Sequence, residues 1–305
     1  MNLETFPELS KKLKGEISLI IRRLDSAVIR MERVTTLVTD HMQRGAYRLD
    51  LADGSISKIR LIPRLEEAVA AVILSRYLDP EYFPKVLDSQ GSILLVEWIE
   101  GRPLTAEEWT TARVYQAAGI QARLHATELK PMDSRPDLSS LGFWWARLEK
   151  KVMALKENGY IKSPDAAGVL RRARVRSGNS VKVGIVHGDF CPENFLLRPS
   201  NSLAVIDLEI LGVTAIPYGL GRTALRWPMS RRLRGLYLDH YGQFSSADEF
   251  LENFTFWMML ILVEALLFLG YAGLSQAKQM VKMINDAVLC EDRRQMGSLF
   301  GYSLE

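Results

Sequence analysis

A dense group of polar residues lies between two apolar runs in the segment "HGDFCPENFLL", residues 187–197. This segment contains Asp189 and Asn194, and Asp207 follows in "LAVIDLEI", which otherwise reads as a buried strand. Carboxylate and amide oxygens suit Mg²⁺, which keeps its remaining positions for phosphate oxygens and water. Asn194 and Asp207 are therefore candidate metal ligands.

Asp189 is then left to accept a proton from an attacking hydroxyl group. Phosphoryl transfer needs this division of labour, because one carboxylate orients the nucleophile while a metal neutralises phosphate charge. We include His187 among the catalytic residues, although we do not expect it to be the base. We expect a core histidine that is hydrogen-bonded to backbone and holds the loop of Asp189 in place. Glu209 has two readings, as a group near the metal or as a solvated side chain.

The composition indicates an ordinary soluble globular protein. The chain has 305 residues, of which 48% are hydrophobic and 25% are charged, enough for one large domain or two lobes. A net charge of +3 is too small to indicate a nucleic-acid partner. The two cysteines, Cys191 and Cys290, have no metal-ligand spacing, and the N-terminus does not read as a signal peptide. We therefore expect a cytoplasmic protein.

One apolar segment, residues 254–274, is long enough to cross a bilayer. Glu264 lies near its middle, however, and the sequence contains no second segment of this kind. The segment therefore predicts a buried helix, and we expect no membrane partner.

The first hundred residues predict a small lobe rich in strands. Residues 1–33 read as helical, and apolar and polar residues then alternate on both sides of Asp53-Gly54, a strong hairpin signal. A helix follows Pro63, and two more strands flank Gln90-Gly91. This lobe would end near residue 103, so the two predicted domains are residues 1–103 and 104–305.

Helices dominate the second predicted domain. Thr105 with Glu108 three residues later has the spacing of a capping box. Two short apolar strands, "VKVGIV" and "LAVIDLEI", bracket the polar segment and would hold its residues in place.

These segments resemble the catalytic and metal loops of the aminoglycoside phosphotransferase and choline kinase superfamily, which is related to the protein kinases. His187, Asp189 and Asn194 keep the spacing of the kinase motif H-R-D-x-x-x-x-N, with Gly in place of Arg, and Asp207 resembles the Asp of D-F-G. The resemblance covers about residues 34–225. It implies an α+β fold, bilobal and protein-kinase-like, with a small antiparallel lobe carrying one helix and a large, mainly helical lobe.

The same resemblance implies an ATP site. "ILLVEWIEGRPL" resembles the hinge of the superfamily at about residues 96–101, where backbone groups of Glu97, Trp98 and Ile99 would meet the adenine. A phosphate-contacting lysine is expected on a strand of the small lobe, and Lys58 fits best, with Arg60 a weaker candidate. A glutamate of the following helix would pair with it. The spacing leaves Glu66 and Glu67 open, and the resemblance favours Glu67.

Two features depart from the family pattern. Only Gly45 stands where protein kinases place a G-x-G-x-x-G loop, and Gly219 stands where relatives commonly carry an Asp. The Asp is largely a scaffold element, so its replacement bears on loop geometry and removes no catalytic group.

The function predicted by the resemblance is ATP- and Mg²⁺-dependent phosphorylation of a hydroxyl group on a small molecule. Aminoglycosides, choline, homoserine and sugars all occur as acceptors in the superfamily, and the protein would act as a monomer or homodimer. The alternative is a catalytically silent nucleotide-binding or scaffold protein. Two basic clusters form either a solvated face or a border of the acceptor pocket: Arg171, Arg172, Arg174, Arg176 and Lys182, then Arg222, Arg226, Arg231, Arg232 and Arg234.

Overall fold

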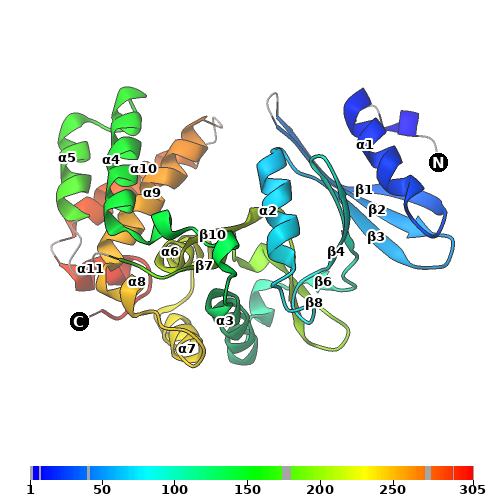
Figure 1. Cartoon of the computed structure of the whole chain (residues 1–305). Helices are drawn as coiled ribbons and strands as arrows, with labels where there is room; N and C mark the ends of the chain where they lie inside the picture. Colours follow the sequence, from blue (N-terminus) through cyan, green and yellow to red (C-terminus); the bar gives the residue numbers. More distant parts are fainter. Residues whose placement is uncertain are drawn as a thin grey trace. The chain divides into compact units, whose positions relative to one another are not determined.

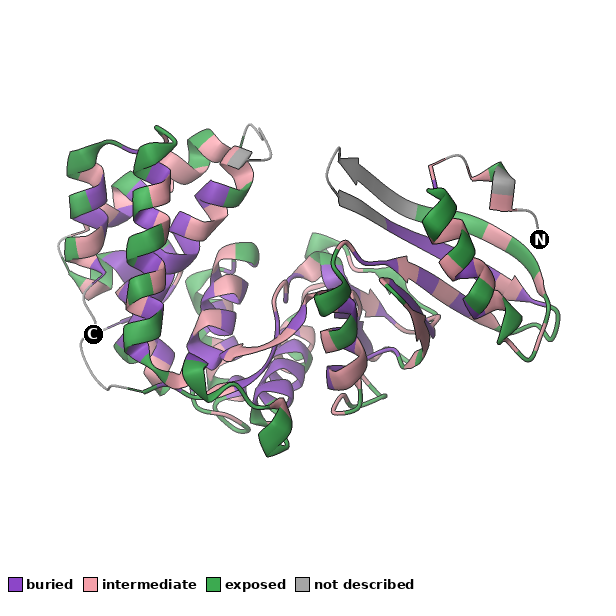
Figure 2. Cartoon of the chain, turned by 45° about the horizontal axis from the view of Figure 1, so that its top comes forward, coloured by how far each residue is buried: buried purple, intermediate pink, exposed green. Residues whose placement is uncertain are grey.

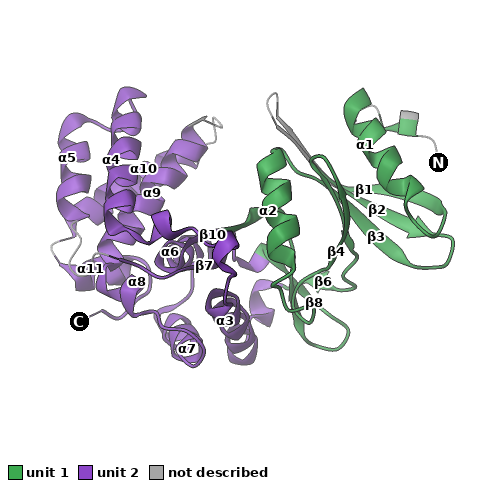
Figure 3. Ribbon diagram, viewed as in Figure 1, with its two compact units in different colours: residues 1–104, 193–212 green, residues 105–192, 213–305 purple. Residues whose placement is uncertain are grey.

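The computed structural model of the chain describes residues 3–6, 8–39, 42–173, 180–271, 276–290 and 292–304 (Figure 1). Arg174, Arg176 and the end of the apolar segment 254–274 lie outside these residues, as does the tip of the loop before Gly45. The chain divides into two compact units, Met1–Leu104 with Glu193–Gly212, and Thr105–Pro192 with Val213–Glu305 (Figure 3). The first division lies one residue from the expected boundary at 103. Residues 193–212, which we expected in the second domain, group with the first unit.

The first unit contains an antiparallel sheet of five strands in the order β1-β2-β3-β5-β4, within the described residues. The strands are β1 (Val28–Thr39), β2 (Met42–Leu51), β3 (Ile56–Leu61), β4 (Val86–Gln90) and β5 (Ile93–Glu97). Gly54 between β2 and β3 has φ +83° and Gly91 between β4 and β5 has φ +57°, a conformation that favours glycine. Both predicted hairpins are confirmed.

A helix covers each face of this sheet. Ile17 and Ile20 of α1 (Lys11–Arg22) pack with Ile93 and Leu95 on one face. On the other face, α2 (Leu65–Ser75) packs through alanines against Leu94 and Val96. Successive residues of a strand point to opposite faces, and the first four residues of β5, Ile93 to Val96, are apolar and buried on both sides (Figure 2).

The expected helix over residues 1–33 is only partly present. A short 3₁₀ turn (Leu3–Thr5) precedes α1, and β1 begins at Val28. Val28 and Met31 both pack toward the core face, although they are three residues apart, because the register with β2 shifts between Val28 and Arg30. This bulge breaks the two-residue alternation by which a strand is recognised in the sequence.

A small three-stranded sheet attaches residues 193–212 to the first unit. It has the order β6 (Arg102–Pro103), β8 (Phe195–Leu197) and β9 (Leu203–Val205) in the described chain. The N–H of Val205 also donates to the carbonyl of Tyr82 at 2.7 Å. These backbone hydrogen bonds explain why residues 193–212 cluster with the strand-rich unit.

Helices make up most of the second unit. They are α3 (Thr111–Ala126), α4 (Leu141–Glu157), α5 (Ser163–Arg172), α6 (Ile216–Arg226), α7 (Arg231–Tyr241), α8 (Asp248–Glu252), α9 (Phe254–Tyr271), α10 (Ala277–Leu289) and α11 (Arg293–Leu299). Strand β7 (Val183–His187) pairs with β10 (Leu211–Ala215). Short 3₁₀ turns span Ala106–Glu108, Pro131–Asp133, Pro136–Ser139, Pro192–Asn194 and Leu208–Ile210. At the first of these turns the carboxylate of Glu108 accepts from the N–H of Thr105 at 2.9 Å, as the capping-box spacing predicted.

Helix α9 is the core of the second unit. It contacts α4, α6 and α10, and its residues Phe256–Val263 are all buried (Figure 2). A helix that is apolar all round needs such neighbours on every side. Among the described helices, none combines the length and apolarity needed to cross a membrane.

The sole acid of α9, Glu264, is bound on two sides. Its Oε1 lies 2.5 Å from Nε of Arg147, and its Oε2 accepts from the hydroxyl of Tyr218 at 2.6 Å. We expect Glu264→Ala to lower the free energy of unfolding by about 1–3 kcal/mol, because it leaves a half-buried arginine without its carboxylate. Urea unfolding measures this change.

The matched control is Asp137→Ala, which breaks the exposed pair of Asp137 with Arg135 at 2.9 Å. Exposed pairs add little to stability, so the urea midpoint should hardly move. Equal midpoint shifts in both variants would show that the pair of Glu264 with Arg147 adds no more than a surface pair.

Candidate active site

The cationic side chains of β3 contact the acidic side chains of residues 193–212 within the first unit. Nζ of Lys58 lies 3.8 Å from Oδ1 of Asp207, and Nη2 of Arg60 lies 3.4 Å from the same oxygen. Arg60 also forms an ion pair with Glu209, which is buried. Lys58 and Arg60 are two residues apart and pair across the sheet with Val96 and Leu94, on the face that α2 covers. The strand register therefore aims both cations at the acids.

Burial and the charge of Arg60 lower the pKa of Lys58 to about 8, although Asp207 acts in the opposite direction. A cation that is removed from water in this way interacts strongly with any anion that reaches it. The site thus holds concentrated positive charge beside two carboxylates.

Asp207 has a left-handed backbone conformation, with φ +69° and ψ +59°. Asp and Asn adopt this region more readily than other residues with a side chain. Just before it, the N–H of Ile206 donates to the carbonyl of Asn194 at 2.9 Å, which holds the two candidate metal ligands on adjoining backbone. Oδ1 of Asp207 faces the two cations, and within the described residues Oδ2 has no protein partner.

These groups fit a magnesium site. Asp207 supplies a carboxylate oxygen with no protein partner in the described chain, and the buried Asn194 supplies an amide oxygen. No group of three or more His, Cys, Asp or Glu that could hold a metal occurs among the described residues. A site with few protein ligands is what Mg²⁺ uses when phosphate oxygens and water complete its coordination.

The structure differs from the expected pairing of Lys58 with Glu67. In the described chain the carboxylate of Glu67 lies 3.7 Å from Nη1 of Arg64, three residues earlier on the same helix. Glu66 is exposed, and the ion-pair partner of Lys58 is Asp207. A neighbour within one helix turn is reached at lower entropic cost than a distant strand lysine, which explains the local pair.

The predicted hinge follows β5. The N–H of Glu97 donates to the carbonyl of Lys85 at 2.9 Å, and the guanidinium of Arg48 lies 5.2 Å from the ring centroid of Trp98. Ile99 is buried, yet its backbone makes no hydrogen bond within the described residues. Buried backbone groups are normally satisfied, so Ile99 is an exception here, and its contact with adenine stays a prediction.

The catalytic loop leaves β7 in the second unit. His187 is fully buried and packs edge-on against Phe190, with ring centroids 6.1 Å apart. Asp189 forms a two-point contact with Arg226 of α6, in which Nε lies 2.7 Å from Oδ1 and Nη2 lies 3.3 Å from Oδ2. Nη2 of Arg226 is also 3.8 Å from Sγ of Cys191. The expected base is therefore oriented by a bidentate arginine.

A second arginine of α6 supports the same loop. Nε of Arg222 donates to the carbonyl of Gly188, and its Nη1 lies 3.5 Å from the hydroxyl of Tyr218. Tyr218 in turn donates to Glu264. Sequence reasoning placed both Arg222 and Arg226 in a basic cluster but did not assign them to the loop. Their spacing of four residues puts them on one face of a helix, which was the available signal.

Helix α3, which packs against β7, contributes His125. Its Nδ1 shares a hydrogen bond of 2.8 Å with the hydroxyl of Tyr241, and burial lowers the pKa of His125 to about 3. Gly219 of α6 packs next to it. A Cβ added at Gly219 would lie 2.5 Å from Cγ1 of Val186 in β7 and 3.4 Å from Nε2 of His125. The departure from the family Asp thus coincides with direct contact between α6 and β7.

A model of the phosphotransferase enzyme family (APH) matches residues 47–252. The chain belongs to this family. The matched region includes Lys58, Asp189, Asn194 and Asp207. A comparison with curated protein sequences finds no match.

Solved structures with the same fold cover nearly all of the chain. Macrolide 2'-phosphotransferase MphH from Brachybacterium faecium has a TM-score of 0.59 at 15% identity, covering 92% of this chain and 99% of that one. Amicoumacin kinase hAmiN, solved with AMP-PNP and Ca²⁺, has a TM-score of 0.62 at 16% identity, covering 97% and 100%. Choline kinase LicA from Streptococcus pneumoniae has a TM-score of 0.59 at 16% identity, covering 91% and 99%. The predicted α+β fold of the kinase-like phosphotransferases is confirmed.

His125 should make stability depend on pH. It stays neutral in the folded chain down to about pH 3, whereas the unfolded chain binds a proton near the ordinary pKa of 6.5. The unfolded state therefore holds more protons between these values, and this group lowers stability as pH falls through that window, by up to about 1.4 kcal/mol per unit. Urea unfolding from pH 7 to pH 5 should show a shallower slope in His125→Gln. A wild-type slope in His125→Gln would contradict the assignment.

A side chain at position 219 should destabilise the fold, because the space beside Gly219 is filled by Val186. Gly219→Ala places a methyl group against Val186, and we expect a loss of about 1–3 kcal/mol of stability. Adding Val186→Ala should recover part of this loss, because it removes the opposing methyl groups. A double-mutant cycle by urea unfolding measures the coupling. Strict additivity would mean that the two residues do not compete for the same space.

Proposed function

We propose that the protein transfers the γ-phosphoryl group of ATP to a hydroxyl group of a small molecule, with Mg²⁺ as cofactor. The observation that carries the proposal is the proximity of Lys58 to Asp207, 3.8 Å apart between Nζ and Oδ1. A phosphate-binding cation and a metal-binding carboxylate serve one nucleotide in this family of reactions. Family membership and the nucleotide and divalent cation bound to hAmiN support the assignment.

The first unit supplies the nucleotide-binding residues in this proposal. Backbone groups from Glu97 to Ile99 bind the adenine, and Lys58 with Arg60 binds phosphate oxygens. Asp207 and Asn194 would hold the metal ion. When bound, Mg²⁺ neutralises phosphate charge and orients the transferred group.

The second unit supplies the base. Asp189 accepts the proton of the acceptor hydroxyl as the oxygen attacks phosphorus. Arg226 fixes the carboxylate at Oδ1 and holds Oδ2 less tightly, so Oδ2 is the oxygen assigned to the hydroxyl. The buried His187 at the end of β7 and Arg222 of α6 position the loop. Only four residues of chain separate Asp189 from Asn194.

The acceptor is assigned here as a small hydroxyl compound. Three relatives of this fold are named for macrolides, amicoumacin and choline, which share a hydroxyl group and little else. Aminoglycosides, homoserine and sugars stay open for this chain. We further propose that it acts in the cytoplasm as a monomer or homodimer.

Thermal unfolding with ATP, with and without Mg²⁺, tests the nucleotide site. At about a hundred times its Kd a ligand stabilises the fold by roughly 2.7 kcal/mol, which is readily visible in Tm. We expect a shift that needs Mg²⁺ in the wild type and is lost in Asp207→Asn. Asn tolerates the left-handed backbone of Asp207, so this variant removes the charge with little strain.

Asp88→Asn is the matched control, since Asp88 pairs with Arg23 at 2.8 Å on the edge strand β4. It should keep the wild-type shift. ADP release with a panel of hydroxyl compounds then tests transfer, and Asp189→Asn should abolish it while nucleotide binding persists. A Mg²⁺-dependent shift without transfer to any acceptor would favour the silent nucleotide-binding alternative. The absence of any shift would overturn the proposal.

A further inference from the structure

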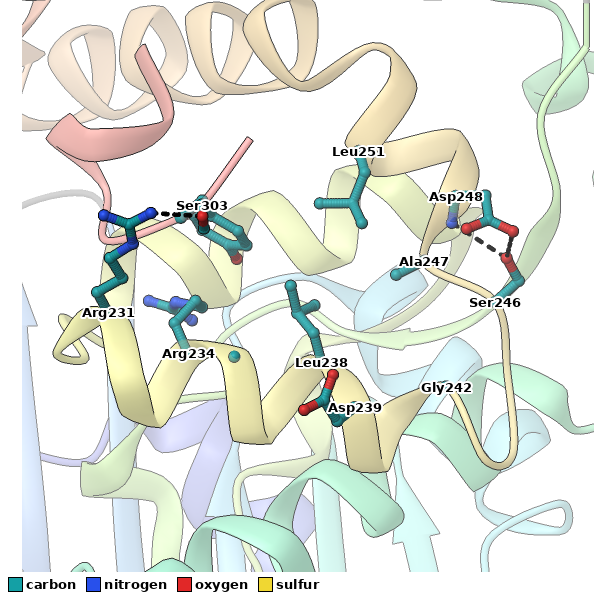
Figure 4. A pocket seen from close by; sticks show the side chains of 12 residues that line it. Arg231, Arg234, Leu238, Asp239, Gly242, Ser246, Ala247, Asp248, Leu251 and Ser303 are labelled. Carbon is teal, nitrogen blue, oxygen red and sulfur yellow. Dashed lines mark hydrogen bonds between the residues drawn. The ribbon is translucent and has the colours of Figure 1, made fainter. Parts of the chain in front are cut away.

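A pocket of about 500 Å³ lies in the second unit among α7, α8 and the C-terminal segment (Figure 4). Its volume is in the range of small-molecule sites, about 300–1,000 Å³. None of the residues assigned above to nucleotide, metal or base lines it. The pocket is therefore a separate feature of this unit.

One end of the pocket is cationic. Arg234 is 1% exposed, and its Nη2 donates to the carbonyls of Ala224 and Trp227 at 3.2 and 2.6 Å. Its guanidinium lies 4.9 Å from the ring centroid of Tyr302. Arg231 stands beside it and donates from Nη2 to Oγ of Ser303 at 2.5 Å. Figure 4 shows the two arginines and Ser303 together at this end.

Within the described residues, no carboxylate balances the charge of Arg234. Its buried Nε has no hydrogen-bond partner in the described part of the chain. The two carbonyls belong to the end of α6 and satisfy only Nη2. A buried guanidinium stays ionised, so it is costly unless an anion accompanies it.

The other end of the pocket is acidic. Asp239 of α7 and Asp248 of α8 lie there, with Oδ2 of Asp248 accepting from the hydroxyl of Ser246 at 2.7 Å. Asp239 is exposed and has no ion-pair partner among the described residues. Leu238 and Leu251 lie between the two ends (Figure 4). Arg231 and Asp239 are eight residues apart on one helix, roughly 12 Å along its axis.

We propose that this pocket binds a small zwitterion. A carboxylate or phosphate group binds Arg231, Arg234 and Ser303, and an ammonium group binds the acids at the other end. A short aliphatic segment covers the two leucines. The separation of unlike charges along one helix face selects against a ligand with charge of a single sign, which would meet a repelling group at one end.

A series of α,ω-amino acids tests the proposal on the full chain. Glycine, 4-aminobutanoate, 6-aminohexanoate and 8-aminooctanoate carry the same two charges at increasing separation. Isothermal titration calorimetry should detect saturable binding of the longer members and none of glycine. Hexanoate and hexylamine, which each carry one charge, should bind at least about tenfold more weakly than 6-aminohexanoate.

Variants locate the binding. Arg234 also holds the end of α6, so its replacement risks unfolding, and Arg231→Gln and Asp239→Asn are used instead. Each should lower the affinity by about tenfold, while Arg232→Gln on α7 and Glu149→Gln on α4 leave it unchanged. Absence of binding by every member up to roughly 10 mM, equal binding of hexanoate, or equal losses in the control variants would overturn the proposal. None of these measurements needs ATP, so the outcome is independent of the proposed function.

Discussion

The contact of β3 with the segment around Asp207 is the interaction on which the arrangement of the first unit depends. Removing Arg60 and Glu209 from water is costly, and a buried ion pair often does no more than offset that cost. The ion pair of Arg60 with Glu209 matters because it fixes the geometry of this contact. Because an unpaired charge at this position would be far more unfavourable, the segment carrying Asp207 must dock in one register against the strand. The short pairing of β6 with β8 enforces the same arrangement through backbone hydrogen bonds.

In the second unit the corresponding role belongs to α6. Its two arginines reach the catalytic loop, its Tyr218 joins the acid of the central helix, and its glycine allows close approach to β7. A single helix thus connects the core of the second unit to the loop that carries Asp189. Its end is held in turn by Arg234, which also lines the pocket inferred above.

The sequence was most informative where chemistry is local. The spacing of Asp189 to Asn194, the position of Asp207 shortly after a strand and the two glycine hairpins can be read from neighbouring residues. The roles of Arg226 and Glu209 depend on elements far apart in the chain, and no periodicity reports such contacts. Glu67 shows the opposite case, since an expectation imported from the family gave way to a nearer partner, Arg64. The missed start of β1 has a similar origin, because a bulge removed the alternation that identifies a strand.

Gly219 has a consequence for how this chain could change over generations. The family resemblance implies an Asp at this position, and here the side chain of Val186 fills the space that its Cβ would need. Replacing Gly219 alone by Asp therefore places its Cβ against Val186. The same replacement does not meet this steric barrier once a smaller residue has replaced Val186. The order of the two substitutions therefore matters, because a smaller residue at position 186 must first make room for a side chain at position 219.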